Sequence, residues 1–342
     1  MSKKKLIGYV NTTDLKTIFE EDIKCLDIIN IAFGHVKQAT IEWNHEGVKE
    51  DIARIKSINP NIKLLLSVGG WSSGGFSEAA ATKEGRLSVA QSAIKLMEEN
   101  NLDGLDLDWE YPSYNVAGIK GCKEDKQNFT ALIKTLRETF NELDQYYMLT
   151  IAAGAGEYYL KGVEMDQIIE HLDYVQLMTY DMRGGFQVLT GHHTNLYCPE
   201  LDLFIASADH SVKIFHEAGV PMNKLVIGIA FYSRLWRDVP NVDNGMIQMA
   251  GTTGGYGPDY GTLVESYINK NNFTRYFDEV AKAPYLFDGS TFISYEDEES
   301  ITHKLNYMYE KELYGAMYWE YRCDQTYTLN RFMKATMNGL ED

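Results

Sequence analysis

Residues 103–112, with the sequence DGLDLDWEYP, place four acidic side chains among apolar ones. Alternate side chains of a β-strand point to the same face. Asp106, Asp108 and Glu110 therefore share one face, and the two leucines and the tryptophan between them share the other. Asp103 has the opposite parity, and we expect it at the entrance of the strand, where it can hold the turn. The pattern predicts a buried strand that carries three carboxyl groups in file.

Asp106, Asp108 and Glu110 follow one another along one face of the strand, and we call them the acid file. Their carboxyl groups affect one another's protonation. Ionised carboxylates at short distance raise one another's pKa, so the three cannot all lose their protons cheaply. We expect a proton to be shared near Asp106 and Asp108, and Glu110 to stay protonated enough to act as a general acid toward a glycosidic oxygen. The alternatives are a solvated loop and a divalent-metal cluster. A loop would not carry apolar residues at every second position, and a metal cluster would take ligands from several segments.

Short apolar runs alternate with segments of helical spacing along the whole chain. Residues 85–100 and 126–143 place apolar residues three and four positions apart, which is typical of amphipathic helices. Near-continuous apolar strands between such helices indicate a parallel sheet covered on both faces. Eight such strands favour a closed (β/α)8 TIM barrel over an open doubly wound sheet. We predict one α/β domain over residues 1–342, with strands at 5–10, 27–33, 62–68, 102–109, 147–153, 172–180, 224–231 and 314–319.

The connection after the seventh strand is much longer than the others and rich in aromatic residues. Its composition favours a packed unit over the alternative, a long disordered loop. We expect a small α+β insertion at residues 235–291, between strands 7 and 8. Active sites of such barrels lie at the carboxyl ends of the strands. Glu110, just before Tyr111-Pro112, would then be the acid nearest a substrate, with Asp108 one layer below.

The overall charge restricts the class of partner. The 342 residues carry a net charge of −17, which disfavours a nucleic acid, because binding a phosphate backbone requires a basic surface. No apolar run approaches the roughly 20 residues that span a bilayer, so no membrane partner is expected. The N-terminal apolar stretch is too short for a secretion signal. It predicts a cytoplasmic protein as written, or an extracellular one if a leader was removed. We expect a monomer.

Other residues that could do chemistry are interpreted as structural, and we expect no metal and no cofactor. His192 and His193 could bind a metal, but in a polar loop we expect them to be solvated. The glycine pairs at 69–70 and 74–75 match no phosphate-binding pattern and indicate a tight turn and a close approach of sugar. The acidic run at 296–299 is typical of a helix start. Wide spacing without CxxC pairs predicts free thiols and no zinc site at Cys25, Cys122, Cys198 and Cys323.

The acidic motif resembles the DxxDxDxE signature of glycoside hydrolase family 18, the chitinases and related endo-N-acetylglucosaminidases. Four further segments resemble motifs of that family in the same order: SVGG (67–70), LMTYD (177–181), GIAFYSR (228–234) and GAMYWEY (315–321). The resemblance spans essentially the whole chain. It implies a (β/α)8 barrel, and the insertion after strand 7 resembles that of the subgroup with a deep substrate cleft.

The resemblance also implies a mechanism. Family 18 is an exception among retaining glycosidases, because the 2-acetamido group of the substrate supplies the nucleophile. Glu110 would protonate the leaving oxygen, and Asp108 would stabilise the oxazolinium ion after exchanging a proton with Asp106. Tyr180 would donate its hydroxyl to the acetamido oxygen. The rest of the pocket around the −1 sugar would be Met178, Asp181 and, as its apolar floor, Trp319.

Aromatic side chains are natural platforms for the apolar faces of sugar rings. Trp71 follows the SVGG turn and could form an outer subsite, and Arg234 could pair with Asp181 or reach the substrate. Strand 1 lacks the tryptophan often found there in the family. Weaker candidates for sugar contacts are Tyr9, Phe33, Tyr111, Tyr232 and Trp236.

The function that the resemblance implies is endo-acting hydrolysis of β-1,4 linkages between N-acetylglucosamine units of chitin or chitooligosaccharides. Two alternatives stay open. One is an endo-β-N-acetylglucosaminidase that acts on N-glycans, and the other is a catalytically silent sugar-binding lectin. Silent relatives usually lose the acid, and the presence of Glu110 disfavours the lectin.

Overall fold

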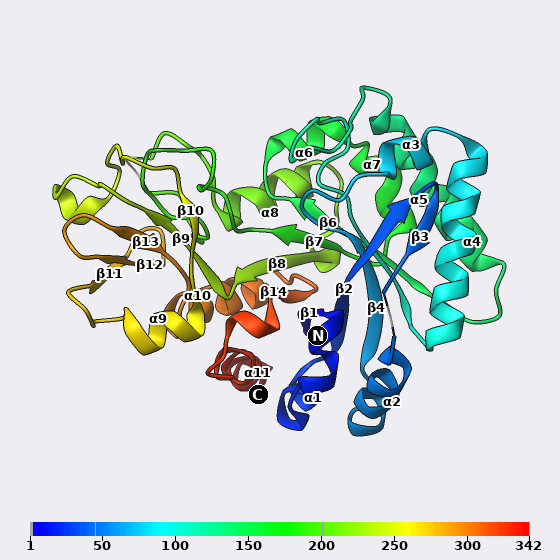
Figure 1. Cartoon of the computed structure of the whole chain (residues 1–342), viewed down its shortest axis with the longest axis horizontal. Coiled ribbons are helices and arrows are strands. Elements are labelled where there is room, and N and C mark those ends of the chain that lie inside the picture. The colour runs from blue at the N-terminus through cyan, green and yellow to red at the C-terminus, as the bar shows by residue number, and fades with distance from the viewer. Residues whose placement is uncertain (1–2, 45, 200–201, 342) are drawn as a thin grey trace.

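The computed structural model describes residues 3–44, 46–199 and 202–341. Among them, eight parallel strands close into a barrel, because β1 pairs with both the last and the second strand of the ring (Figure 1). The predicted (β/α)8 fold is confirmed. The barrel strands are β1 (Lys5–Asn11), β2 (Ile28–Lys37), β4 (Lys63–Gly69), β5 (Gly104–Asp108), β6 (Met148–Gly154), β7 (Val175–Met178), β8 (Leu225–Ala230) and β14 (Gly315–Trp319).

Helices cover the outside of the barrel (Figure 1). Two long ones, α4 (Lys83–Asn100) and α5 (Asp125–Asn141), begin and end within two residues of the predicted segments. The Thr82 side chain accepts a hydrogen bond from the N–H of Gly85, which satisfies a donor at the start of α4. The others are α1 (Glu20–Cys25), α2 (Val48–Ile58), α3 (Phe76–Ala80), α6 (Glu157–Gly162), α7 (Met165–Ile168), α8 (Ala208–Glu217), α10 (Glu298–Glu310) and α11 (Leu329–Glu341), with 3₁₀ turns at Thr12–Thr17, Ile169–His171, Met222–Lys224, Asp243–Gly245 and Tyr321–Cys323.

β5 separates two environments, as its alternating sequence predicts. On the outer face, the two leucines and Trp109 are buried against the helices, and the Trp109 ring stacks on Phe76 with centroids 5.3 Å apart. On the inner face, Asp106 and Asp108 are buried inside the barrel. The strand ends at Asp108, so Glu110 lies just beyond its carboxyl end.

The entrance of β5 is held by the remaining acid of the motif. Asp103 accepts a hydrogen bond from the N–H of Leu64. It also forms ion pairs with Lys56 and Lys63, at N–O distances of 2.9 and 3.1 Å. Its predicted place at the strand entrance is confirmed.

A second sheet lies beside the barrel, between β8 and β14 of the chain (Figure 1). It is antiparallel, with the order β10-β9-β13-β12-β11. Buried aromatic rings, among them Trp236 and Phe292, form its core. The sheet begins before and ends after the 235–291 range expected for the insertion. Its elements are β9 (Tyr232–Trp236), β10 (Gly255–Asp259), α9 (Tyr260–Ser266), β11 (Thr274–Asp278), β12 (Ala283–Phe287) and β13 (Phe292–Ser294).

Two segments differ from their predictions. β2 continues beyond residue 33 and turns back into β3 (Thr40–Glu42) as an antiparallel hairpin. In the acidic run at 296–299, Asp297 caps α10 as expected. Glu296 instead is buried and forms an ion pair with Lys304, with an N–O distance of 2.5 Å.

The four cysteines are free thiols, as predicted. No helix in the described ranges has both the length and the apolar character needed to cross a membrane. The first two residues of the basic N-terminal segment lie outside the described residues.

Candidate active site

A cavity of about 860 Å³ opens at the carboxyl ends of the barrel strands. Asp106 lies below it in the barrel interior. The interpretation of Trp236 as a sugar contact is wrong, because this residue is buried in the second sheet and its Nε1–H donates to the carbonyl of Gln187. The other residues singled out from the sequence line the cavity together: Tyr9, Phe33, Trp71, Asp108, Glu110, Tyr111, Met178, Tyr180, Asp181, Tyr232, Arg234 and Trp319.

Asp106 is held by side chains from β1, β4, β6 and β7. Its Oδ2 accepts hydrogen bonds from the hydroxyls of Tyr9 and Ser67, at 2.8 and 2.7 Å. Its Oδ1 accepts from the Thr150 hydroxyl and the Gln176 amide, at 2.7 and 2.9 Å. Burial raises the pKa of Asp106, and these hydrogen bonds oppose the rise because they stabilise the carboxylate. The carboxylate is therefore fixed in one orientation.

Asp108 lies one step further along the same face in a different environment. Its Oδ1 is buried without a hydrogen-bond partner among the described residues. Burial, and then the charges of Glu110 and Asp106, raise the pKa of Asp108 well above its usual range. We therefore expect the proton shared between Asp106 and Asp108 at neutral pH to reside on Asp108.

Glu110 reaches the cavity just beyond β5. Burial raises its pKa to about 7, while a hydrogen bond with Tyr111 opposes the rise and the charge of Asp181 adds to it. A carboxyl group with this pKa exchanges protons readily near neutral pH. This suits a group that must act first as an acid and then as a base.

An apolar floor and a hydroxyl donor line the same cavity as Asp108 and Glu110. Trp319 ends β14, and the Phe33 ring stacks on it with centroids 5.4 Å apart and an interplanar angle of 18°. The Tyr9 ring lies 5.6 Å from the same indole. The Tyr180 hydroxyl donates to the sulfur of Met317 at 3.8 Å. Burial raises the pKa of Tyr180 well above its usual range, so the hydroxyl keeps its proton and can donate it in a hydrogen bond.

An ion pair joins the barrel mouth to the second sheet. Nε of Arg234, on β9, donates to Oδ1 of Asp181 at 2.6 Å, and Nδ1 of His193 lies 3.7 Å from the same oxygen. Burial alone would raise the pKa of Asp181. The interactions with His193 and Arg234 outweigh burial and hold that pKa well below its usual range. The predicted pairing of Arg234 with Asp181 is confirmed.

The prediction that His192 and His193 are solvated is wrong. Both are buried, because the loop after β7 packs against the second sheet. The N–H of His193 donates to the Ser294 hydroxyl, and Nε2 of His192 lies 3.2 Å from Oδ2 of Asp278. Burial lowers the pKa of His193 to about 4, so its imidazole is neutral. In the described part of the chain, no group of three or more His, Cys, Asp or Glu residues could hold a metal ion.

The glycine pair at the end of β4 permits close packing of protein atoms at the site, in agreement with its interpretation as a turn. Neither glycine is among the described residues that line the cavity, so the close approach of sugar there stays a prediction. Gly69 has a φ of 123°, and a Cβ there would lie 2.0 Å from the carbonyl oxygen of Asp108. Gly70 has a φ of 89°, and a Cβ there would lie 2.8 Å from the Phe33 ring. Glycine adopts such backbone angles without strain, and only glycine leaves room for both neighbours.

The sequence matches the model of glycosyl hydrolases family 18 over residues 5–324. The chain belongs to this family. Among solved structures, a family 18 N-acetylglucosaminidase from Paenibacillus barengoltzii is 53% identical, with a TM-score of 0.96. The match covers 97% of this chain and 99% of that one. The family membership implied by the five motifs is confirmed.

Two curated relatives of this family 18 chain carry chitinase-type names. Chitinase A1 of Niallia circulans is 38% identical over 307 residues, which cover 83% of this chain and 44% of the relative. Chitotriosidase-1 of Mus musculus is 32% identical over 344 residues, which cover 93% of this chain and 73% of the relative. This chain thus spans less than half the length of Chitinase A1.

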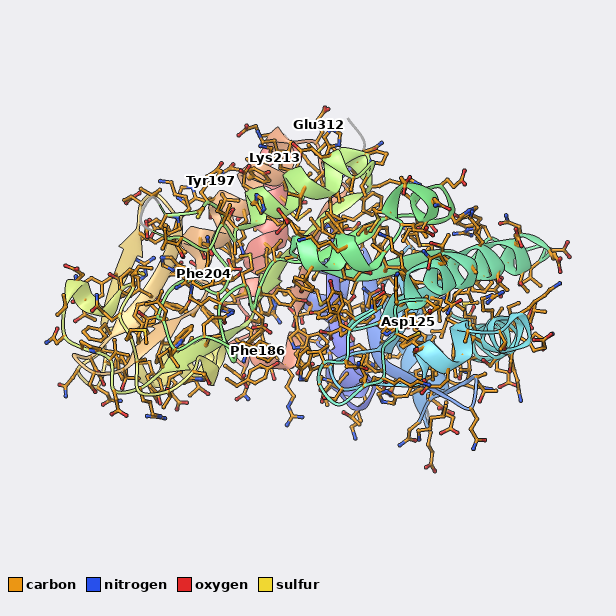
Figure 2. The ribbon with its side chains drawn as sticks, turned by 90° about the horizontal axis from the view of Figure 1, so that it is seen from above. Asp125, Phe186, Tyr197, Phe204, Lys213 and Glu312 are labelled. Carbon is orange, nitrogen blue, oxygen red and sulfur yellow. The ribbon has the colours of Figure 1, made fainter. Side chains whose placement is uncertain are left out.

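The rim of this family 18 site contains aromatic residues that the sequence did not single out. Trp71, after β4, contacts Phe186 in the loop after β7, with ring centroids 6.4 Å apart. Figure 2 shows Phe186 between the barrel and the second sheet. Both rings stay largely exposed, at 49% and 77%. Tyr158, at the start of α6, packs edge-on against Tyr111. These rings form an exposed aromatic rim on one side of the cavity.

Some of the missed residues carry a signal in the sequence. Thr150 and Gln176 lie within strands, and applying the strand period to β6 and β7 would have placed them inside the barrel. Tyr158 and Phe186 follow the carboxyl ends of the same strands, where barrel enzymes place their site loops. Tyr256, whose ring lies 4.0 Å from the Arg234 guanidinium, is in the second sheet and has no such signal.

Proposed function

We propose that this protein hydrolyses β-1,4 linkages between N-acetylglucosamine units of chitin-type oligosaccharides, with retention of the anomeric configuration. The observation that carries the proposal is the acid file along β5, which ends at Glu110 in the same cavity as the Trp319 floor and the Tyr180 hydroxyl. The family match and the names of the relatives support the class of sugar.

In the proposed reaction the substrate supplies its own nucleophile. Glu110 gives its proton to the glycosidic oxygen as the bond from that oxygen to C1 breaks. The carbonyl oxygen of the 2-acetamido group of the −1 sugar bonds to C1, which forms an oxazolinium ion. Water then gives a proton to Glu110 and its oxygen to C1, which restores the acetamido group. Two inversions at C1 leave the configuration retained.

The neighbouring side chains prepare and stabilise this intermediate. Tyr180 donates its hydroxyl to the acetamido oxygen and orients it toward C1. Asp108 turns to the acetamido N–H and, once ionised, stabilises the positive charge. The proton that Asp108 releases passes to Asp106, whose carboxylate is the adjacent acceptor in the file. Trp319 supports the apolar face of the −1 ring.

A second candidate is the release of single N-acetylglucosamine units from chain ends. It is favoured by the 53% identical structure, which is named as an N-acetylglucosaminidase and matches over almost its whole length. Both candidates use the same acid file. They differ in whether the sugar chain continues on one side of the −1 site or on both.

Mass spectrometry of the products from a chitin hexasaccharide and from an N-glycosylated protein tests the proposal. The wild-type protein should shorten the hexasaccharide and leave the glycoprotein intact. Glu110→Gln keeps the shape of the side chain but removes the proton donor, so turnover should fall about 10²–10⁴-fold while the sugar still binds. Release of the N-glycan would identify the endo-β-N-acetylglucosaminidase alternative. Binding without any product from the wild-type protein would identify a lectin.

A further inference from the structure

The topology of the barrel sets the direction in which a substrate chain lies. In the ring order β1-β14-β8-β7-β6-β5-β4-β2, closed by the β1–β2 pair, β5 and β14 are opposite each other. Glu110 follows β5, and Trp319 ends β14. A line from Glu110 over Trp319 therefore crosses the barrel mouth. Residues that follow Trp319 lie on the far side from the acid.

The cavity differs between the two ends of this line. At the strand ends of β14, β1 and β2, its lining residues are confined, within the described structure, to Trp319, Tyr9 and Phe33, the aromatic floor itself. The segments that follow β8, the other neighbour of β14 in the ring, add Tyr232, Arg234 and Tyr256 to the lining. On the half from β4 to β7, the cavity extends over the strand ends and far into the loops that follow. It reaches Trp71, Tyr114, Val116, Glu157, Tyr158, Phe186, Ile205 and His210.

Two polar side chains lie beside the aromatic floor at the ends of β1 and β14, just outside the described lining of the cavity. Asn11 is the last residue of β1, and Glu320 directly follows Trp319. Nδ2 of Asn11 donates a hydrogen bond to Oε2 of Glu320, which joins the ends of β1 and β14. We call this pair the end wall.

The end wall is held in place from behind. Thr12, next to Asn11, donates its hydroxyl to the carbonyl of Ala32 at 3.0 Å and accepts from Nε1 of Trp43 at 2.9 Å. On the other side, the carbonyl of Trp319 accepts from the N–H of Phe231 at 2.8 Å, which ties the start of the Glu320 segment to β8. The segments that carry Asn11 and Glu320 are therefore both held in place by hydrogen bonds to neighbouring parts of the barrel.

The direction of the sugar chain determines which of its groups face the end wall. In a β-1,4 chain, C1 of each sugar carries the bond toward the reducing end, and O4 carries the bond toward the non-reducing end. A sugar on Trp319 that presents C1 to Glu110 must direct O4 away from it, toward Asn11 and Glu320. An amide and a carboxyl group are suitable hydrogen-bond partners for free hydroxyls.

We propose that Asn11 and Glu320 close the site behind the −1 sugar, bind the free hydroxyls of a non-reducing terminal N-acetylglucosamine, and limit the protein to the release of single sugars from that end. The proposal rests on the hydrolytic function proposed above. It differs from the endo action that the family resemblance implied, because an endo-acting site needs the chain to continue where the end wall stands. The two residues are specificity-determining and take no part in the chemical steps.

The position at which p-nitrophenyl-(N-acetylglucosamine)₂ is first cleaved tests this directly. The disaccharide has one sugar–sugar bond and one bond to nitrophenol. If the protein has a single sugar site, the −1 site, on the non-reducing side of the cleaved bond, the wild-type protein should release N-acetylglucosamine and p-nitrophenyl-N-acetylglucosamine first. Initial release of p-nitrophenol with the intact disaccharide would overturn the proposal while leaving the hydrolytic function standing. Cleavage of neither bond would overturn the hydrolytic function itself.

Variants of the end wall sharpen the test. Glu320→Ala and Asn11→Ala should each shift the first cut toward p-nitrophenol release, by about tenfold in the ratio of the two products, as expected when a site loses its discriminating hydrogen bonds. Glu320→Gln keeps the size and the hydrogen-bonding capacity, so it should retain the wild-type ratio. An unchanged ratio in both alanine variants would contradict the role of the end wall.

Two controls separate specificity from folding. Glu312 is an exposed acid that precedes the first residue of β14, at the periphery of the molecule and at the other end of the strand from Glu320 (Figure 2). Glu312→Ala should therefore leave the ratio of the two products unchanged. A substrate whose terminal sugar lacks O4 should be cleaved about tenfold less efficiently by the wild-type protein, because the hydrogen-bonding groups of the wall lose their partner. This selectivity should disappear in Glu320→Ala. Equal cleavage of both substrates by the wild-type protein would overturn the proposal without relying on any variant.

Discussion

The two halves of the barrel mouth present different surfaces to a substrate. The half from β4 to β7 carries exposed aromatic rings, including Trp71 and Phe186, above a long cavity. The half from β14 to β2 contributes, among the described residues, only the aromatic floor of Trp319, Tyr9 and Phe33 to the cavity, and the hydrogen bond between Asn11 and Glu320 lies at its strand ends. Both halves rest on the same ring of parallel strands and flank the same acid file. In this fold the strands position the chemistry, and the residues just beyond them decide how a polymer enters.

The largest effect on activity is expected for Asp108→Asn, because Asp108 belongs to the acid file that both halves of the barrel mouth flank. The variant cannot become an anion beside the oxazolinium ion, so kcat/KM should fall about 10²–10³-fold. The loss should be the same for short and long substrates. Because Asn resembles the protonated carboxyl that we expect at this buried position, the unfolding temperature should change little. Activity near that of the wild type, measured with nitrophenyl and oligosaccharide substrates, would contradict the proposed mechanism.

A smaller and selective effect is expected for Trp71→Ala on the open half. Loss of one aromatic platform is worth about 1 kcal/mol, or roughly fivefold in affinity. KM should therefore rise for a hexasaccharide but hardly change for p-nitrophenyl-N-acetylglucosamine. Phe19→Ala is a matched control, since Phe19 is exposed to a similar degree, 45% against 49%, and does not line the described cavity. Equal effects of Trp71→Ala on both substrates would place the ring outside the sugar path.

The smallest effect concerns pH. As the general acid, Glu110 must be protonated in the free protein, so kcat/KM should fall as the pH rises through about 7. The charge of Asp181 helps to raise the pKa of Glu110. Asp181→Asn removes that charge and leaves the Arg234 cation without its partner, and both changes lower the pKa of Glu110. The alkaline limb should therefore move to lower pH. A limb that stays in place or moves upward would show that another group titrates there.

The barrel and the acid file could be predicted from the sequence because their signals are local. The period of two in residues 103–112 separates the carboxyl groups from the apolar side chains, and the structure places them on opposite faces of β5. The five family motifs lie at the ends of strands, so they converge once the barrel closes. Twelve of the residues expected in the site therefore line one cavity.

What could not be predicted depends on contacts between distant segments. His192 and His193 have polar neighbours in the sequence, and only the packing of their loop against the second sheet buries them. Glu320 and Asn11 are 309 positions apart and meet because the last strand of the barrel pairs with the first. Glu320 belongs to the GAMYWEY segment and Asn11 to no quoted motif, and no local pattern indicates that the two residues meet.

The early products from a chitin hexasaccharide tagged at its reducing end would test the difference between the two halves most directly. Time-resolved mass spectrometry of the wild-type reaction should first show untagged N-acetylglucosamine and tagged pentasaccharide, because the closed half admits one sugar. Early untagged disaccharide or trisaccharide, with the matching shorter tagged product, would mean that the chain continues past Asn11 and Glu320. That result would contradict a site open on one side only.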